Sequence, residues 1–597
     1  MAVPGKTDTG DERRKAEASA EIHDEQSSAA LTRLGEALAD QRAYLAGYER
    51  PSEPVVYETL RALDDLFCRE LMEPPQTLDK EERLYRSLSG WGVNQALRRI
   101  VPKRLDARPL RILPSIDENR SRVDDFLFNC GTLDLAERYE GWLREGILTG
   151  HLRRHEIPDE SGAMEVLLLR SATASFFDED IGRSGMRWAS SLARARDGSR
   201  ERRLENRHRK IARRMERHVE LLDGWLVTSS STREFDDYFL EWARLYLRRM
   251  QSQDIIGPDD VIGGRPFSRY VEVLTALSAR SQKHLAFAGI LKARHPSVHL
   301  RNLLTTHADR ENFIRALAEY MDADFGEMED ILASFVLRGD NLELHAEGGQ
   351  TVWAPIVQAS AHALLLPIYG LDINPFLFLF TELRTRHEKD WFRIANNRER
   401  RWIEEIERLF QGPRWQIHRR NLRLREGGKD LTDIDFAVYD RKNNELGLLQ
   451  LKWQQPVGMD SRLRRSAGRN LIAEGNRWIR SVSAWLDRHG SAELMRRLDF
   501  ESLSSPAIQL FVLGRYHVHL TGFDGRDEGA VWSDWAHFHR TRLEKPKRSI
   551  SQTASALRFT IDNSRAAKKS GSTMFPVGDL SLILNPTSVP EQAEGAR

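Results

Sequence analysis

Residues 433–453 hold two apolar segments on either side of a short polar turn, and they constrain the fold more than any other part of the chain. The first segment is DIDFAVY (433–439), which predicts a strand. The second, LGLLQLKW (446–453), is almost continuously apolar, as is typical of a central strand that is buried on both faces. Because the turn over 440–444 is so short, we expect the two strands to be adjacent and antiparallel.

Elements of alternating type flank this pair of strands. A helix is indicated by the apolar stripe that includes Trp402, Ile406 and Phe410, and Gly412 with Pro413 ends it. The predicted elements outside the pair are a helix over 390–411, a strand over 415–424, a helix over 466–488 and a strand over 506–514. The resulting order is α-β-β-β-α-β.

The rest of the chain is expected to form at least one more domain, because 597 residues exceed the size of a single hydrophobic core. Apolar residues recur at helical spacing through most of the first half, whereas 341–357 alternate around Gly348-Gly349 and predict a β-hairpin. We therefore expect an α+β multidomain protein. Its predicted parts are a disordered tail over 1–27, a mainly helical region over 28–332, a connecting region with a hairpin and buried helices over 333–388, the α-β-β-β-α-β domain over 389–545 and a C-terminal extension over 546–597.

The sequence favours a cytoplasmic protein without a membrane partner. The N-terminal residues lack an apolar signal segment. The longest apolar run, 359–380, contains Asp372 and two prolines, so we interpret it as a buried helix, a turn and a second buried segment and not as a membrane span. Cys68 and Cys130 are too few for a disulfide framework, which suits a reducing compartment.

Asp435, Gln450 and Lys452 are the candidate catalytic residues. Period-2 geometry places Gln450 and Lys452 on one face of their strand, and the antiparallel pairing brings Asp435 to the same end. Carboxylate and amide oxygens suit a Mg²⁺ ion, and a lysine beside the metal can orient a water molecule and stabilise negative charge. The residue types therefore fit hydrolysis of a phosphodiester.

The D…Q-x-K pattern within the order α-β-β-β-α-β resembles the PD-(D/E)xK nuclease superfamily, the restriction-endonuclease-like fold. Glutamine in place of glutamate resembles the Q-x-K branch found in Mrr-like nucleases. The resemblance covers about 390–515. It implies that Asp435 and Gln450 bind Mg²⁺ or Mn²⁺, that the backbone carbonyl of Leu451 can also bind the metal, and that Lys452 is the catalytic lysine.

The family usually contributes a glutamate from its first helix. Glu399 lies on the apolar stripe of the predicted helix and is the first choice for this role, with Glu404 and Glu405 as alternatives. Asp433 is a candidate accessory acid. Because Gln450 is neutral, the predicted metal site carries one negative charge fewer than the commonest form in the family, which leaves catalytic activity open.

Arginine-rich segments flank the candidate residues. Residues 414–425 contain five Arg and no acid, and residues 462–480 contain six Arg and one acid, Glu474. Arginine pairs with phosphate in a bidentate manner, and neutralised phosphates release counterions. The candidate nucleic-acid contacts are Arg419, Arg420, Arg464, Arg465, Arg469 and Arg477. The alternative is that these arginines belong to ordinary solvated faces.

Together the motifs predict a metal-dependent endonuclease, with DNA as the expected substrate. By analogy with the family, it would be the effector of a prokaryotic anti-phage defence system, with the helical region binding a trigger or partner protein. The alternative is a catalytically inactive nuclease-fold protein that serves as a scaffold for nucleic acid or protein.

Overall fold

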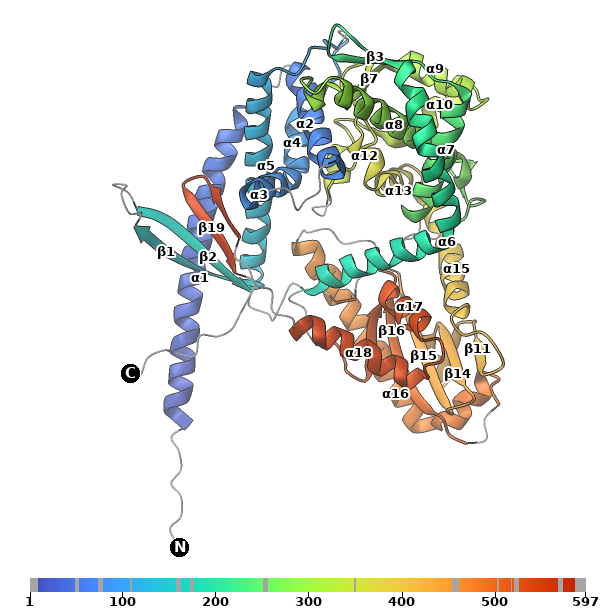
Figure 1. Ribbon diagram of the computed structural model, residues 1–597. Coiled ribbons are helices and arrows are strands. Elements are labelled where there is room, and N and C mark those ends of the chain that lie inside the picture. The colour runs from blue at the N-terminus through green and yellow to red at the C-terminus, as the bar shows by residue number, and fades with distance from the viewer. Residues whose placement is uncertain are drawn as a thin grey trace.

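A computed structural model describes residues 9–48, 53–72, 79–107, 110–156, 163–171, 177–250, 256–347, 351–453, 461–501, 504–516, 518–519, 525–566 and 573–585. These residues form a mixed α and β protein in which helical bundles adjoin small sheets (Figure 1). Within these ranges, no helix has the length and apolar character that a membrane span requires.

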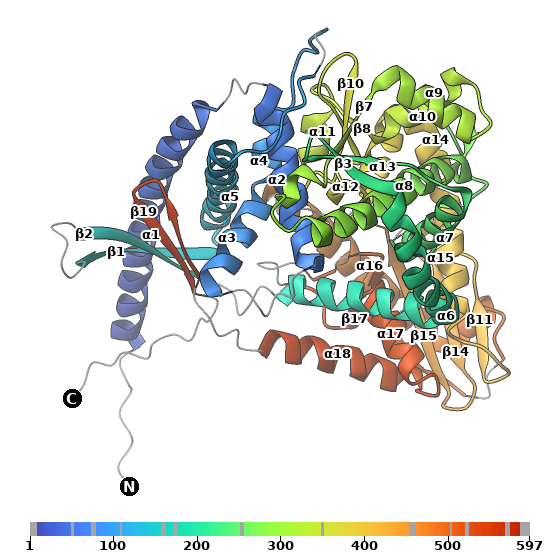
Figure 2. The same cartoon turned by 45° about the horizontal axis from the view of Figure 1, so that its top comes forward.

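The N-terminal helices pack around one apolar core, to which the C-terminal strands also contribute. These elements are α1 (Thr9–Ala46), α2 (Glu53–Met72), α3 (Lys80–Trp91), α4 (Val93–Ile100), α5 (Asp117–Arg144), β1 (Leu148–Glu156) and β2 (Ala163–Ser171), with β18 (Thr573–Val577) and β19 (Leu580–Asn585) from the other end of the chain. The four strands form a sheet of order β1-β2-β19-β18, in which β2 and β19 are parallel. Figure 2 shows this sheet beside the long helix α1.

Two expected boundaries are therefore corrected. Residues 9–27 belong to α1 although their composition predicted disorder, and 1–8 lie outside the described residues. The region beyond 545 is not a separate extension, because Phe575, Val577, Leu580 and Leu582 are buried in the N-terminal core. The C-terminal strands take this place because they bury apolar side chains against helices that are distant in the sequence.

A second helical part follows, with its own apolar cores. Its elements are α6 (Phe177–Met215), η2 (Glu216–His218), β3 (Val219–Leu222), β4 (Leu226–Ser229), α7 (Arg233–Met250), β5 (Val261–Ile262), β6 (Arg265–Pro266), α8 (Phe267–Arg294), η4 (Leu300–Asn302), β7 (Thr306–Asp309), α9 (Arg310–Tyr320), α10 (Phe325–Leu332), η5 (Ala333–Phe335), β8 (Val336–Leu337), α11 (Leu342–Ala346), β9 (Ile356–Gln358), β10 (Ala363–Leu366), α12 (Tyr369–Asp372), α13 (Pro375–Arg386) and α14 (Glu388–Arg393). Strands β7, β10, β9 and β8 form a sheet in that order.

The hairpin expected over 341–357 is wrong. Asn341 closes a turn, since its side chain accepts from the Arg338 N–H at 2.7 Å and donates to the Val336 carbonyl at 3.0 Å, and helix α11 begins directly after it. Gly348 and Gly349 lie outside the described residues. Strand β9 instead pairs with β10, so the first part of the apolar run 359–380 is a strand and not a helix, followed by α12 and α13.

The C-terminal α/β part is built on a sheet of order β11-β14-β15-β16-β17. Its elements are α15 (Ala395–Glu407), β11 (Trp415–His418), β12 (Leu422–Glu426), β13 (Lys429–Ile434), β14 (Phe436–Asp440), β15 (Glu445–Lys452), α16 (Ser461–Arg497), β16 (Ala507–Gly514), β17 (Ala530–Asp534), α17 (Trp535–Glu544) and α18 (Ile550–Ala566). Strands β11, β14 and β15 are antiparallel neighbours, and β15, β16 and β17 are parallel.

Helices cover both faces of this sheet. Leu446 and Leu448 of β15 share a core with Trp478, Val482 and Trp485 of α16. The intervening residues of β15 point to the opposite core, which is formed with α15, α17 and α18. Since Ile550, Ala554 and Leu557 belong to this second core, the α/β part continues past residue 545. Helix α6 packs against α17 and α18 and connects this part with the helical parts (Figure 1).

The strands expected over 415–424 and 433–439 are each divided in two. Strands β12 and β13 form a separate antiparallel hairpin, whose turn places Gly427 and Gly428 at positive φ. The chain bends at Asp435, between β13 and β14. The bend leaves Asp435 at the start of β14, at the edge where β15 ends.

A buried carboxylate in this fold gives a prediction for stability. Asp534 is the N-cap of α17 and accepts from the His537 N–H at 2.9 Å, and desolvation raises its pKa to about 7. Asn is an equally good N-cap but carries no charge. With an unfolded pKa near 3.9, Asp534→Asn should raise the free energy of unfolding by up to about 4 kcal/mol above pH 7. The gain should shrink as pH falls through 7 and vanish below about 4.

Urea unfolding of both proteins at several pH values measures this gain. Asp324→Asn is the matched control, because Asp324 caps α10 in the same manner, at 2.9 Å from the Glu327 N–H, but is exposed. A stability gain that does not depend on pH, or equal gains in both variants, would contradict the assignment of a desolvated charge to Asp534.

Candidate active site

Asp435 is held against strand β15 by main-chain and side-chain contacts. Its N–H donates to the Leu449 carbonyl at 3.2 Å. Its Oδ2 accepts from the Leu451 N–H at 2.7 Å and from the Gln450 side-chain amide. The carboxylate is buried. The bend before β14 therefore fixes one acid at the carboxyl end of β15.

Gln450 and Lys452 lie on the same face of β15, as their spacing predicts. The register pairs Phe436 with Leu449, which confirms the expected antiparallel pairing. Leu449 and Leu451 pack into the core under α15, so Gln450 and Lys452, which alternate with them, face α16. Gln450 is buried, whereas 22% of the Lys452 side chain is exposed. Lys452 is thus the member of the pair that a substrate can reach.

Lys452 forms an ion pair with Glu474 of α16. Its Nζ lies 3.0 Å from Oε2 of Glu474, and 53% of the Glu474 side chain is exposed. Glu474 was not among the site residues predicted from the sequence. Glu474 lies four residues before the buried Trp478, and residues four apart share a helix face. This spacing could have indicated that Glu474 faces the sheet.

Further acids act electrostatically on Asp435. Desolvation raises the pKa of Asp435 to about 7, and the negative charges of Asp433 and Glu399 add to this effect, although the Leu451 N–H opposes it. The pKa of Glu399 is also raised, by partial desolvation and by Asp433. The structure therefore brings Glu399 of α15 into one electrostatic environment with Asp433 and Asp435.

The other acids considered on the first helix have different surroundings. Glu405 accepts from Arg515 Nη1 at 2.7 Å, in a pair whose arginine is buried among tryptophan rings. Glu404 is exposed. Of the three alternatives, only Glu399 is coupled to the carboxylates beside β15 in the part of the chain that the structure describes.

Asn421, just before β12, and Trp478 of α16 donate hydrogen bonds to the segment that carries Asp433 and Asp435. Asn421 Nδ2 donates to Asp433 Oδ2 at 2.7 Å and lies 3.3 Å from Asp435 Oδ1. Trp478 Nε1 donates to the Asp433 carbonyl at 2.6 Å. Neither Asn421 nor Trp478 was predicted from the sequence to have such a role. Asn421 sits between two short strands that the sequence presents as one, so no local pattern marked it.

The candidate nucleic-acid arginines have different environments. Arg420, Arg469 and Arg477 are exposed, and so is Arg419, which lies 3.3 Å from Glu407. Arg465 instead pairs with Glu145, the residue that follows α5, and so links α16 to the helical part. Arg464 belongs to α16, but its side chain lies outside the described residues.

The groups around Asp435 suit a hard cation, because they offer carboxylate oxygens and negative charge. The negative charges of Asp433 and Glu399 help to raise the pKa of Asp435, and a cation beside Asp435 would relieve this repulsion. However, the amide nitrogen of Gln450 faces Asp435, so its oxygen is not the atom directed at the acid. No group of three or more His, Cys, Asp or Glu residues within the described ranges is arranged as a metal site.

Comparison of the chain with protein-family models, curated proteins and solved structures finds no match. Function must therefore be argued from the site itself.

Proposed function

We propose that the α/β part, residues 395–566, is a nuclease domain of the PD-(D/E)xK type that hydrolyses phosphodiester bonds with Mg²⁺ or Mn²⁺. The proposal depends most on the hydrogen bonds that Asp435 accepts from Gln450 and Leu451. These two residues directly precede Lys452 on strand β15. An acid, an amide and a lysine then meet at one end of β15.

The topology supports the same proposal. Helix α15 precedes β11, β14 and β15, and α16 connects β15 to the parallel strand β16. This order resembles the α-β-β-β-α-β core of the restriction-endonuclease-like fold, with the hairpin β12–β13 inserted before β14. In this resemblance Asp435 and Lys452 correspond to the acid and the lysine of the family.

The chemistry divides among the residues of this chain. A bound Mg²⁺ or Mn²⁺ would polarise the phosphate and lower the pKa of a water molecule. Asp435 would hold the metal, with Glu399 and the Gln450 and Leu451 oxygens as further candidates. Lys452 would orient the attacking water and stabilise charge that develops on the phosphate. Its ion pair with Glu474 is partly exposed, so a substrate phosphate can compete for the ammonium group.

Arginine side chains support a nucleic acid as substrate. Arg420, Arg469 and Arg477 are exposed on segments that flank the site in sequence, and each can pair with a phosphate. We take DNA as the substrate, and a cytoplasmic effector of prokaryotic anti-phage defence as the role, with the helical parts binding a trigger or partner protein. This last step is analogy with the family.

A second candidate function is a catalytically inactive scaffold for nucleic acid or protein. Two contacts favour it, because the site residues bind one another: Gln450 donates to Asp435, and Glu474 neutralises Lys452. An inactive site would keep these pairs when nucleic acid binds.

A metal-dependence series separates the two candidates. The full-length protein is incubated with supercoiled plasmid, linear duplex, single-stranded DNA and RNA, in Mg²⁺, Mn²⁺ or EDTA. Cleavage that requires the metal and is lost with Lys452→Ala supports the nuclease. Binding without cleavage of any substrate would establish the scaffold and overturn the nuclease.

A further inference from the structure

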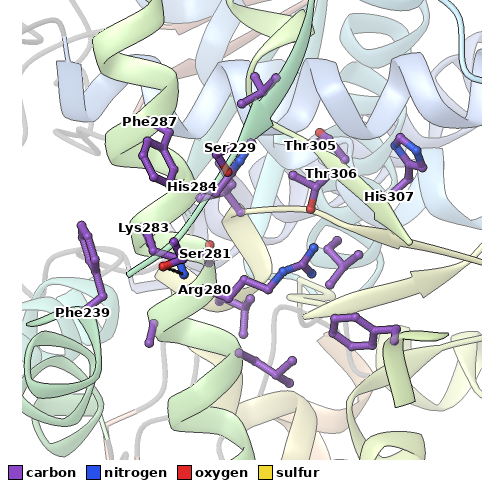
Figure 3. Close-up of a pocket in the computed structure, with 18 of the residues that line it drawn as sticks. Ser229, Phe239, Arg280, Ser281, Lys283, His284, Phe287, Thr305, Thr306 and His307 are labelled. Atoms are coloured by element: carbon purple, nitrogen blue, oxygen red, sulfur yellow. Dashed lines mark hydrogen bonds between the residues drawn. The ribbon is translucent and has the colours of Figure 1, made fainter. Parts of the chain in front are cut away.

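A cavity of about 660 Å³ lies in the second helical part, away from the candidate active site. Its walls come from helices α7, α8, α9 and α12, from strands β4 and β7, and from Tyr57 of α2 (Figure 3). Cavities of this size commonly hold small organic ligands. The proposed nuclease chemistry leaves this cavity without a role.

The cavity contains one positive charge without a counter-ion. Its charged lining residues are Arg280, Lys283 and Asp236. Lys283 and Asp236 neutralise each other, since Nζ of Lys283 lies 2.5 Å from Asp236 Oδ1, and Lys283 also donates to Ser231 at 2.8 Å. The Arg280 guanidinium is therefore the uncompensated charge.

Arg280 has neither a hydrogen bond nor an ion pair with any residue that the structure describes. The guanidinium carbon lies 5.0 Å from the centroid of the Phe313 ring. Arg280 is exposed, so its guanidinium can meet a ligand that enters the cavity from solution. A guanidinium at the cavity without a counter-ion is free to pair with a carboxylate or a phosphate.

Polar groups on the opposite wall lie within the reach of the same ligand. Figure 3 shows Arg280 extending from α8 towards the strand that carries Thr306 and His307. Desolvation lowers the pKa of His307, and the positive charges of Arg61 and Arg280 add to this effect. His284 is fixed through Nε2, 2.8 Å from the Leu303 carbonyl. The lining thus offers donors and no free acid within the described residues.

The remaining surface of the cavity is largely apolar. Phe239 and Phe287 line it from α7 and α8, and Phe313 and Leu317 line it from α9. Aromatic side chains at this spacing can contact a ring or a hydrocarbon body. The cavity therefore combines one unpaired guanidinium with aromatic walls.

We propose that this cavity binds a small organic oxyanion, a phosphate monoester or a carboxylate with an aromatic body, whose charged group pairs with Arg280. A guanidinium forms two parallel hydrogen bonds with either group, and Thr306 and His307 can complete the set. The aromatic body would lie against Phe313, whose ring is beside the guanidinium. This site does not depend on the nuclease proposal, because no residue of the candidate active site lines the cavity.

Calorimetric titration and thermal unfolding of the full-length protein test the proposal. The probes are AMP and benzoate, each with its uncharged counterpart, adenosine or benzyl alcohol. AMP or benzoate should bind and raise the melting temperature, and the one that does identifies phosphate or carboxylate as the recognised group. The uncharged counterpart of that probe should bind at least ten times more weakly.

Arg280→Met removes the charge and keeps the length of the side chain. Without ligand the variant should melt at about the wild-type temperature, because Arg280 has no hydrogen bond or ion pair with a described residue to lose. Its affinity for the anionic probe should fall at least tenfold. Arg280→Lys keeps the charge but not the paired N–H groups, so it should retain part of the affinity. This variant also serves as the test if Arg280→Met does not fold.

Arg315→Met is the matched control, since Arg315 lies on the exposed side of α9 in a pair with Glu311 and does not line the cavity. The proposal is overturned if neither anion binds, if the uncharged counterparts bind as well, or if Arg280→Met and Arg315→Met bind alike.

Discussion

Replacing Lys452 with methionine should lower the rate of metal-dependent DNA cleavage by at least about 10²–10³-fold, the loss typical of removing one electrostatic contact to a transition state. Lys452 is the only cation of the Asp435–Gln450–Lys452 set, and 22% of its side chain is exposed for contact with a phosphate. Methionine has a similar length, so packing beside α16 is retained while the charge is lost. Initial rates on plasmid DNA at saturating Mg²⁺ measure the effect.

Lys442→Met is the matched control. Lys442 is exposed in the turn between β14 and β15, at the far end of β15 from Lys452. It should cleave DNA at the wild-type rate. If both variants lost activity equally, or if Lys452→Met cleaved normally, Lys452 would not be the catalytic lysine.

Much of the proposed site follows from local sequence patterns. The short turn over 440–444 makes β14 and β15 neighbours, and period-2 alternation then sets which residues of β15 face α16. Register and alternation are properties of a few consecutive residues. For this reason the juxtaposition of Asp435 with Gln450 could be predicted without a structure.

Other parts depend on contacts between segments that are distant in the chain. Asn421 reaches Asp435 only because the chain bends between β11 and β12, and Glu474 reaches Lys452 only once α16 lies across the sheet. Likewise β19 completes a sheet with β2, about 400 residues away, because Leu582 finds its apolar core there. No local pattern encodes such partners.

The electrostatics of the site also emerge only in three dimensions. Asp435 is a carboxylate at the start of an apolar strand in the sequence, whereas in the fold it is desolvated and faces the charges of Asp433 and Glu399. Such an arrangement of like charges is unfavourable without a cation. This arrangement of charges is therefore the observation that most favours a metal at the site. It also selects Asp435 as the residue whose substitution should be most informative.

Asp435→Asn should abolish detectable binding of Mn²⁺ at this site and lower cleavage by at least about 10³-fold, because a metal supplies several kcal/mol of transition-state stabilisation and each 1.36 kcal/mol is tenfold in rate. The asparagine oxygen can still accept from the Leu451 N–H, so the bend before β14 should persist. Mn²⁺ titration measures metal binding separately from activity, and circular dichroism verifies the fold.

Asp430→Asn is the control, since Asp430 lies nearby on β13 but is exposed and pairs with Arg423 and Arg425. It should bind Mn²⁺ and cleave DNA as the wild type does. Normal Mn²⁺ affinity in Asp435→Asn, together with normal cleavage, would remove Asp435 from the site. If Asp435→Asn loses Mn²⁺ binding but the wild-type protein cleaves no nucleic acid, the acids would instead hold a structural cation within a scaffold.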